Sequence, residues 1–390
     1  MKGLFALAWK HARFHRLRTA LLVLSLGLGL SIPIATRWMT TDLQQMLTRR
    51  AESTPMLVGS PGSRVDLVLG GLYFHADGLR TIPYGLLEKV LQDHLIEAVP
   101  LHLLHHAKSY PVVGTSLDYF PKRNLTLQSG TLPRRLGDCL LGADVARRLN
   151  LQPGAQLLSD AKGFLNPVGD LPLKMRITGV LSPSYSPDDQ AVFVDIKTAW
   201  LMDGIAHGHM KEKQAAKEQI LQQNNQAVTL GANVQNYMEV TDENLQSFHF
   251  HGEKSTFPLT SILIYPTSKR NGILWEGRFQ NDSEILIVHP LAVVQELISM
   301  LINIRHIVDA VVVALGIVML ILLLLLGSLS LQLRKREMET FHAIGASRSI
   351  RAWLITLDFL LIFVLSLPVT FLLSWLFAMM GKPLLFQLLI

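Results

Sequence analysis

The chain has little charge and almost no cysteine. Only 17% of its 390 residues are charged, whereas soluble domains carry about 25%. Cys139 is the only cysteine, so no disulfide can form within the chain, and we expect it to be a small buried apolar residue. The one Gly-Lys pair, Gly381-Lys382, is followed by proline, so no P-loop motif is present. ATP hydrolysis by this chain is therefore not expected.

Patterns that would indicate chemistry or nucleic-acid binding are also missing. No spacing of Ser, His, Asp, Cys or paired carboxylates indicates a catalytic group, so we predict that the protein is not an enzyme and has no cofactor. The net charge is +6, but the basic residues do not alternate with aromatic residues in a stripe. Nucleic acid is therefore not an expected partner.

Three uncharged runs cover residues 19–36, 311–333 and 359–381. About 20 apolar residues span the hydrocarbon core of a bilayer, so we predict membrane helices at 19–39, 307–333 and 352–381. A cleaved signal peptide is the alternative for the first run. No small-residue cleavage site precedes Arg37, which favours an uncleaved anchor.

The basic residues near these runs predict the orientation. Residues 1–18 carry five basic residues and no acid, and residues 334–351 carry five basic residues against two acids. Both segments should therefore be cytoplasmic, the first as an amphipathic basic helix and the second as a loop. Residues 40–303 then face the periplasm, and the protein is expected in the inner membrane as a multi-pass protein.

The region 40–303 has alternating signals for strands and helices. The predicted helices lie at 84–92, 141–151 and, as a polar solvated arm, 209–226. The expected fold is an α-helical membrane protein with a large mixed α/β extracytoplasmic domain inserted between membrane helices 1 and 2. The strands are predicted at 65–69, 110–116, 174–181, 191–196, 261–265 and 284–288.

Ten of the 14 histidines lie in this outer domain, with clusters at 102–106, 207–209 and 249–251. Imidazole is a common zinc ligand, but no cluster has the spacing of a structural zinc site and no cysteine pair accompanies them. We therefore predict histidines on surface or lid loops, with no metal site. A metal-handling role stays open as an alternative.

The loop between the second and third membrane helices reads RKREMETFHAIGASRS at 334–349. Its apolar residues recur at i, i+3 and i+6, which suits a helix that docks in a partner's groove, while the basic residues can reach the lipid boundary. An amphipathic helix that lies on the inner leaflet without a partner is the alternative. The residues predicted to contact the partner are Arg336, Glu337, Met338, Phe341, Ile344, Gly345, Ala346 and Ser347.

The order of four segments along the chain is informative: the amino-terminal segment, two stretches of the outer domain and this loop. The two stretches read LTLQSGTLPRRLGDCLLGADVARRLNLQPGAQL and MRITGVLSPSYSPDDQAVFVDIKTAW. Together the four segments resemble permeases of the MacB/FtsX/LolC-type ABC transporters, the mechanotransmission class. That family has a fourth membrane helix, where this sequence has only the apolar tail 382–390. The tail could reflect truncation, an end outside the membrane or a stub against the bundle. The matching positions are Gly130, Gly142, Ala146, Leu149, Leu151, Gly154, Gly179 and Asp189.

The resemblance implies a permease subunit that couples ATP hydrolysis by a separate cytoplasmic ATPase dimer to motion of the periplasmic domain. The loop 334–351 would dock on the ATPase, and a second permease copy or a paralogue would complete the complex. A periplasmic adaptor or lipoprotein and membrane lipid are further expected partners. The substrate would be a lipid, lipoprotein, peptide, drug or metal-related compound of the envelope. A transmembrane signalling protein without transport is the alternative function.

Overall fold

The structure is a computed structural model of the 390-residue chain. It describes residues 2–389 except 77, 93, 161–170, 209–219, 225–226, 231–236, 334–338, 341–342, 344 and 346. The chain forms two compact units, residues 1–46 with 296–390 and residues 47–295.

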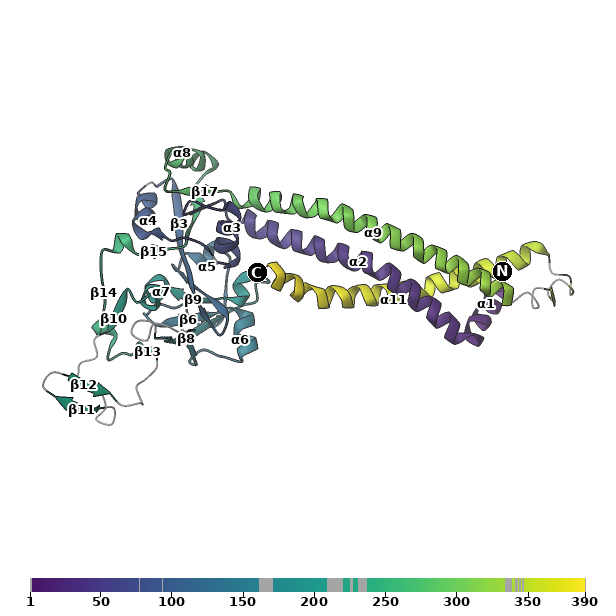
Figure 1. The fold of residues 1–390 in the computed structure, drawn as a ribbon, viewed down its shortest axis with the longest axis horizontal. Coiled ribbons are helices and arrows are strands. Elements are labelled where there is room, and N and C mark those ends of the chain that lie inside the picture. Colours follow the sequence, from purple (N-terminus) through teal and green to yellow (C-terminus); the bar gives the residue numbers. More distant parts are fainter. Residues whose placement is uncertain are drawn as a thin grey trace. The chain divides into compact units, whose positions relative to one another are not determined.

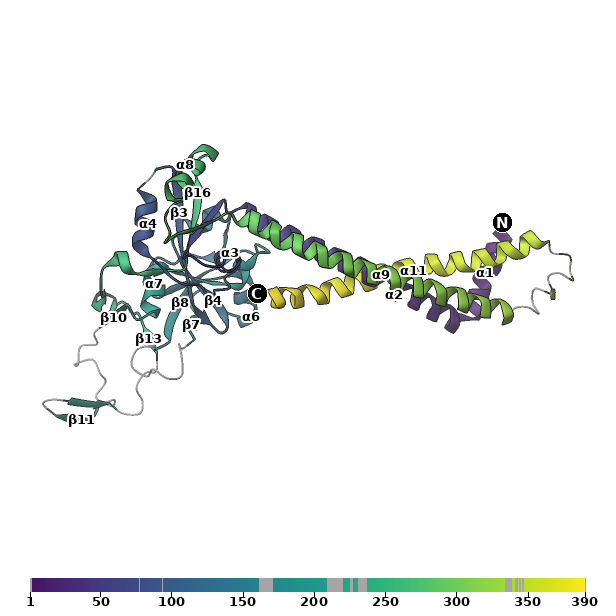
Figure 2. The same cartoon turned by 45° about the horizontal axis from the view of Figure 1, so that its top comes forward.

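The first unit is helical. It holds α1 (Lys2–Phe14), most of α2 (Arg16–Glu52), most of α9 (Pro290–Leu333) and α11 (Arg348–Leu389). Within this unit α2 and α9 run side by side in both views (Figure 1 and Figure 2). The Ser374 hydroxyl of α11 donates to the Ser31 carbonyl of α2 at 3.2 Å. Small residues permit this close packing, since a Cβ on Gly27 would lie 2.8 Å from Val369 Cγ1.

Large apolar side chains cover the outside of this unit. Leu21 is 62% exposed, Phe371 64% and Met380 62%. Among the described residues, two helices are long and apolar enough to cross a membrane, Arg16–Glu52 and Ala352–Gly381. They contain the predicted spans 19–39 and 352–381. The predicted span 307–333 lies within α9, where the structure leaves many side chains undescribed. α11 also continues as a helix through the tail to Leu389.

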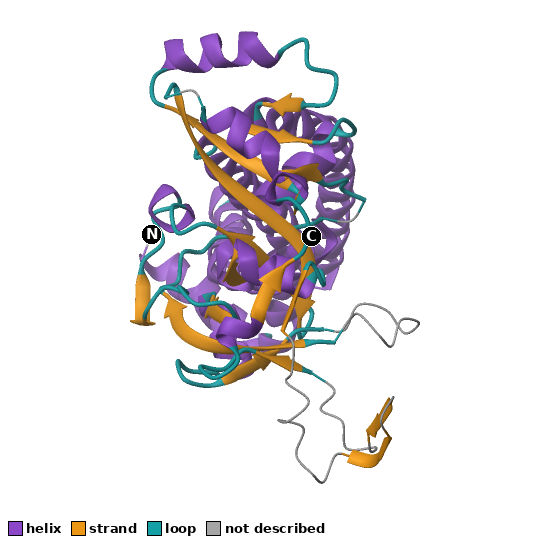
Figure 3. Ribbon diagram, turned by 90° about the vertical axis from the view of Figure 1, so that its left-hand side faces the viewer, coloured by secondary structure: helices purple, strands orange, loops and turns teal. Residues whose placement is uncertain are grey.

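The second unit is built on a mixed sheet (orange strands in Figure 3). Its main path runs β13-β8-β6-β9-β4-β3-β16-β1-β17, with β5 and β7 also paired to β8. The pairs β4–β9, β6–β8 and β13–β8 are parallel, and the other pairs are antiparallel. The strands are β1 (Met56–Gly59), β3 (Ile96–Ala107), β4 (Tyr110–Thr115), β5 (Leu127–Gly130), β6 (Asp138–Leu141), β7 (Gln156–Leu158), β8 (Leu173–Leu181), β9 (Val192–Asp195), β13 (Met238–Glu239), β16 (Ser261–Pro266) and β17 (Leu286–Val288).

Helices and, among the described residues, three small strand pairs complete this unit. The pairs are β2 (Ile82–Pro83) with β15 (Pro258–Leu259), β10 (Ala206–Gly208) with β14 (Phe248–Phe250), and β11 (Ile220–Asn224) with β12 (Ala227–Leu230). The helices are α3 (Arg64–Tyr73), α4 (Tyr84–Leu91), α5 (Tyr119–Lys122), α6 (Ala143–Leu149), α7 (Ile196–Met202) and α8 (Lys269–Phe279), with 3-10 turns η1 (Pro187–Gln190), η4 (Leu245–Ser247) and η5 (Lys254–Thr256). The mixed α/β character predicted from the sequence is confirmed.

Two predicted elements of this unit are wrong. Residues 65–69 form part of α3 and not a strand. The Ser63 side chain accepts from the Asp66 N–H, an N-cap that the Ser-x-x-Asp pattern signals. The predicted polar helix 209–226 is also contradicted where it is described, since residues 220–224 form β11 and pair with β12. Strand pairing there overrides the helix propensity of the segment, because propensity is only a weak determinant of secondary structure.

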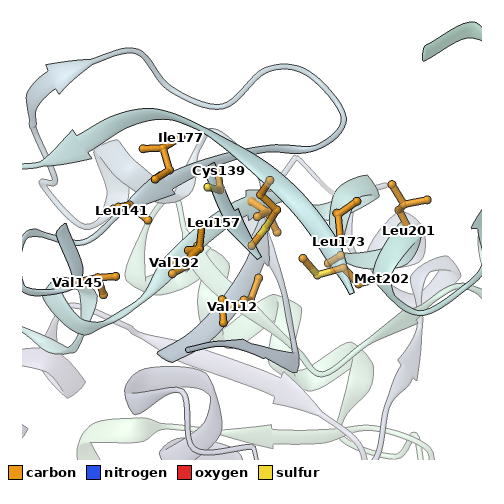
Figure 4. Close-up of a cluster of buried hydrophobic side chains, with 14 of the residues drawn as sticks. Val112, Cys139, Leu141, Val145, Leu157, Leu173, Ile177, Val192, Leu201 and Met202 are labelled. Carbon is orange, nitrogen blue, oxygen red and sulfur yellow. The ribbon is translucent and has the colours of Figure 1, made fainter. Parts of the chain in front are cut away.

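Cys139 lies in β6 within a buried apolar cluster, together with Leu141, Leu157 and Val192 (Figure 4). It is fully buried. Burial, with a smaller contribution from the charge of Asp138, raises the pKa of the Cys139 thiol. The prediction of a small buried apolar role is confirmed.

We expect Cys139 to resist alkylation while the domain is folded, because the thiolate is the reactive form and the thiol is shielded from reagent. Mass spectrometry of the full-length protein after iodoacetamide treatment at pH 8 measures this, with a sample in guanidinium chloride as the control. Rapid labelling of the folded protein would contradict the buried placement. Since no second thiol competes, the labelling rate also reports unfolding of this domain.

Candidate functional site

Arg50 lies in the last turn of α2 and is only 7% exposed. Its guanidinium makes a two-pronged ion pair with the carboxylate of Asp188: Nη1 donates to Oδ2, and Nη2 donates to Oδ1 at 3.0 Å. Nη2 also donates to the Tyr119 hydroxyl at 3.0 Å, and Nε donates to the Leu72 carbonyl at 3.0 Å. The end of α2 is thus held by three separate segments of the domain.

Asp188 is 1% exposed and sits in the turn η1. Its carboxylate also accepts from the Tyr119 hydroxyl at 2.5 Å and from the Ser186 hydroxyl at 2.8 Å. The next residue, Asp189, holds the preceding loop because it accepts from the backbone N–H groups of Ser184 and Tyr185. Gly142 lies against the same turn, where a Cβ would be 2.3 Å from the Asp188 carbonyl oxygen. This close approach requires glycine at position 142.

The two charges stabilise each other. Burial disfavours the charged Arg50 guanidinium, but Asp188 and Tyr119 outweigh this effect and raise the pKa of Arg50. Burial likewise disfavours the Asp188 carboxylate, yet the positive charge of Arg50 and its hydrogen bonds hold the pKa of Asp188 below its usual range. Both groups are therefore charged at neutral pH.

A second buried arginine lies beside this ion pair. Arg123 is 8% exposed, and its Nη1 donates to the Ser53 hydroxyl at 2.7 Å, one residue beyond the end of α2. Burial, followed by the charge of Arg50, lowers the pKa of Arg123. The Arg123 guanidinium carbon lies 5.8 Å from the centre of the Tyr119 ring, and that of Arg50 lies 5.7 Å from the Phe74 ring. We define the anchor as Arg50, Asp188, Tyr119 and Arg123.

The residues predicted to contact an ATPase are mostly undescribed. Gly345 has φ +86°, a left-handed conformation that favours glycine. The Ser347 hydroxyl accepts from the Ile350 N–H at 3.3 Å, so it caps the first turn of α11. Their role in coupling stays a prediction. Arg336, Glu337, Met338, Phe341, Ile344 and Ala346 lie outside the described residues.

The prediction of histidines on surface or lid loops is wrong for His102 and His105, whereas His106 is exposed. His102 and His105 belong to β3 and are 0% and 5% exposed. The Nε2 atom of each approaches the carboxylate of Asp203, at 2.6 Å for His102 and 2.9 Å for His105. His249 and His251 are exposed, with ring centres 4.5 Å apart. His209 lies outside the described residues.

The sequence alone predicted neither the anchor nor the cluster of His102, His105 and Asp203 as a site. Arg50 and Asp188 are 138 positions apart, and no local pattern joins them. The two adjacent arginines after the first apolar helix resemble ordinary membrane-flanking residues, although only Arg50 is buried and Arg49 is exposed. The adjacent acids Asp188 and Asp189 were noticed only through Asp189.

Comparison with known proteins gives a family match that includes the anchor residues. A family model described as the MacB-like periplasmic core domain matches residues 19–242. The chain is similar to the periplasmic region of MacB from Actinobacillus actinomycetemcomitans, with 10% identity, a TM-score of 0.34 and coverage of 63% of this chain and 94% of that one. It is also similar to the extracellular domain of the noncanonic ABC-type transporter YknZ from Gram-positive bacteria, with 8% identity, a TM-score of 0.30 and coverage of 60% and 98%. No curated protein matches the chain.

Proposed function

Because the chain belongs to the family with a MacB-like periplasmic core domain, we propose that it is the permease subunit of an ABC transporter and transmits motion between a cytoplasmic ATPase and that domain. The family match supports a permease-type role and a periplasmic location for residues 47–295. The substrate is proposed to be an envelope compound: a lipid, lipoprotein, peptide, drug or metal-related molecule.

The proposed topology places α2, α9 and α11 in the inner membrane. Two of them, α2 and α11, have the length and composition of membrane helices, and apolar side chains cover the outside of their unit. The basic flanks at 1–18 and 334–351 support cytoplasmic positions for both segments.

The observation that carries the proposal is the continuity of α2. One helix contains the apolar run 19–36 and, further along, the buried Arg50. A helix is stiff along its axis, and its end is fastened to Asp188 and Tyr119 by charge-assisted hydrogen bonds. We infer that displacement of α2 in the membrane would pull on η1 and α5.

The energy source is proposed to be an ATPase dimer on the cytoplasmic side, because this sequence contains no P-loop. The loop 334–351 would supply the contact. A second copy of this chain or a paralogue would present the second loop, and a periplasmic adaptor or lipoprotein would receive the substrate. We propose that the chain itself catalyses no reaction and encloses no substrate channel.

Reporter fusions test this topology. Alkaline phosphatase, which is active only outside the cytoplasm, should be active when fused after residue 120 or residue 230 and inactive after residue 340. Green fluorescent protein at the same positions gives the opposite pattern and serves as the control. Phosphatase activity at position 340 would overturn the orientation and, with it, the proposed cytoplasmic contact.

A further inference from the structure

The buried histidines of β3 face the same side of the sheet because of a β-bulge. Residues three apart in a regular strand point to opposite faces. Here His102 pairs with Gly114 and His105 pairs with Val112, so the register shifts between them and β3 holds one residue more than β4. The extra residue turns both imidazoles toward one side.

Asp203 reaches these imidazoles from the helix above. It ends α7, which packs over β4 where Gly114 leaves room: a Cβ on Gly114 would lie 2.5 Å from Ala199 Cβ. One ligand atom from each of His102, His105 and Asp203 can be chosen so that all three lie within 4.8 Å of one another. The three side chains are 0%, 4% and 9% exposed.

Hydrogen bonding alone accounts poorly for this cluster. His102 Nε2 lies 2.6 Å from Asp203 Oδ2 without the alignment of a hydrogen bond. Buried polar atoms without hydrogen bonds are costly. In addition, the carboxylate of Asp203 sits at the carboxyl end of α7, where the helix dipole favours a positive charge. A cation held by His102 Nε2 and the Asp203 carboxylate would give that nitrogen a partner and would place a positive charge at the end of the helix.

The geometry points to a binding site for a divalent transition-metal cation, of the zinc class, formed by His102, His105 and Asp203. Two imidazole nitrogens and one carboxylate oxygen form a ligand set that zinc takes when it keeps an open position. At bond lengths of about 2.0–2.1 Å, tetrahedral ligand atoms lie about 3.4 Å apart, so the Asp203 carboxylate would move back by less than about 1 Å. The bound ion would tie α7 to β3. This inference does not depend on transport or on an ATPase.

The test is zinc titration of the full-length protein in detergent after removal of metal with a chelator. We expect one high-affinity zinc per chain, of micromolar Kd or tighter, and a higher melting temperature with zinc. Asp203→Asn and His105→Gln, which preserve size and hydrogen-bonding capacity, should each weaken that affinity at least about tenfold. Co²⁺ should give a visible absorption spectrum that both variants lose.

The matched control is the double variant His249→Gln/His251→Gln, which removes the exposed histidine pair. It should bind zinc like the wild type. If it loses zinc while Asp203→Asn and His105→Gln retain it, the ion binds the exposed pair and the proposed site is wrong. Absence of zinc and Co²⁺ binding in the wild type would also overturn it and would leave a hydrogen-bonded His–Asp–His cluster. The zinc titration does not depend on the proposed contact with an ATPase, so failure of that proposal would leave the metal site untouched.

Discussion

Arg50→Ala is expected to destabilise the periplasmic domain by about 3–5 kcal/mol, because it leaves the carboxylate of Asp188 buried without its cationic partner. For a domain of this size, that loss corresponds to a fall of about 6–20 °C in melting temperature. The measurement is thermal unfolding of the full-length protein in detergent, followed by alkylation of Cys139 so that only the periplasmic domain is observed.

Arg49→Ala is the matched control, since Arg49 has the same charge on the same helix turn but is exposed. It should change stability by less than about 0.5 kcal/mol. The double variant Arg50→Met/Asp188→Asn should cost clearly less than the sum of the single changes, because both charges are removed together. An equal loss of stability in Arg49→Ala and Arg50→Ala would contradict the claim that the buried Arg50–Asp188 pair stabilises the domain.

The same pair predicts a dependence on pH. The pKa of Asp188 is lower in the folded protein than its usual value near 4. Its charge therefore stabilises the fold fully above about pH 4, and this contribution is lost as the pH falls through the lowered folded value. The stability difference between the wild type and Asp188→Asn should thus be constant at neutral pH and shrink under strong acid. A difference that grows as the pH falls would contradict this sign.

The double variant also separates folding from transmission. If it folds and still recruits the ATPase but no longer couples nucleotide state to the periplasmic domain, the anchor transmits force. Coupling can be measured as the nucleotide-dependent change in protease protection of residues 47–295. Unchanged coupling would limit the anchor to a structural role.

Arg336→Glu together with Phe341→Asp is expected to release the ATPase from the membrane complex. Replacing an apolar anchor of a groove-bound helix with a carboxylate costs about 2–4 kcal/mol, which is about 30- to 700-fold in affinity. The measurement is co-purification of the ATPase with tagged permease, normalised to the amount of permease in the membrane.

Ala343→Asp is the control for Phe341→Asp, because it adds the same single negative charge and position 343 lies about 200° from Phe341 around an ideal helix. It should leave the ATPase bound. If the ATPase stays at wild-type stoichiometry in the double variant, the loop lies on the membrane surface and does not carry the contact. The anchor would be unaffected by that result, because it belongs to the periplasmic domain.

The sequence by itself determined the features that depend on local pattern. The length of the uncharged apolar runs indicated the candidate membrane helices. Runs of β-branched residues predicted the strands around 110–116, 174–181 and 261–265. Helix 84–92 was predicted from its apolar spacing. Where an apolar run was too short to distinguish strand from helix, at 65–69, only the Ser63 cap indicated the helix.

The tertiary structure alone decided which distant residues meet. Arg49 and Arg50 are chemically alike in sequence, and only the packing of α2 buries one of them against Asp188. The spacing of His102 and His105 would place them on opposite faces of a regular strand, and a bulge brings them together at Asp203. Charge pairing and metal-ligand geometry depend on distances of a few ångströms between segments about 100 or more residues apart. Sheet order and register set those distances, and no local pattern in the sequence specifies them.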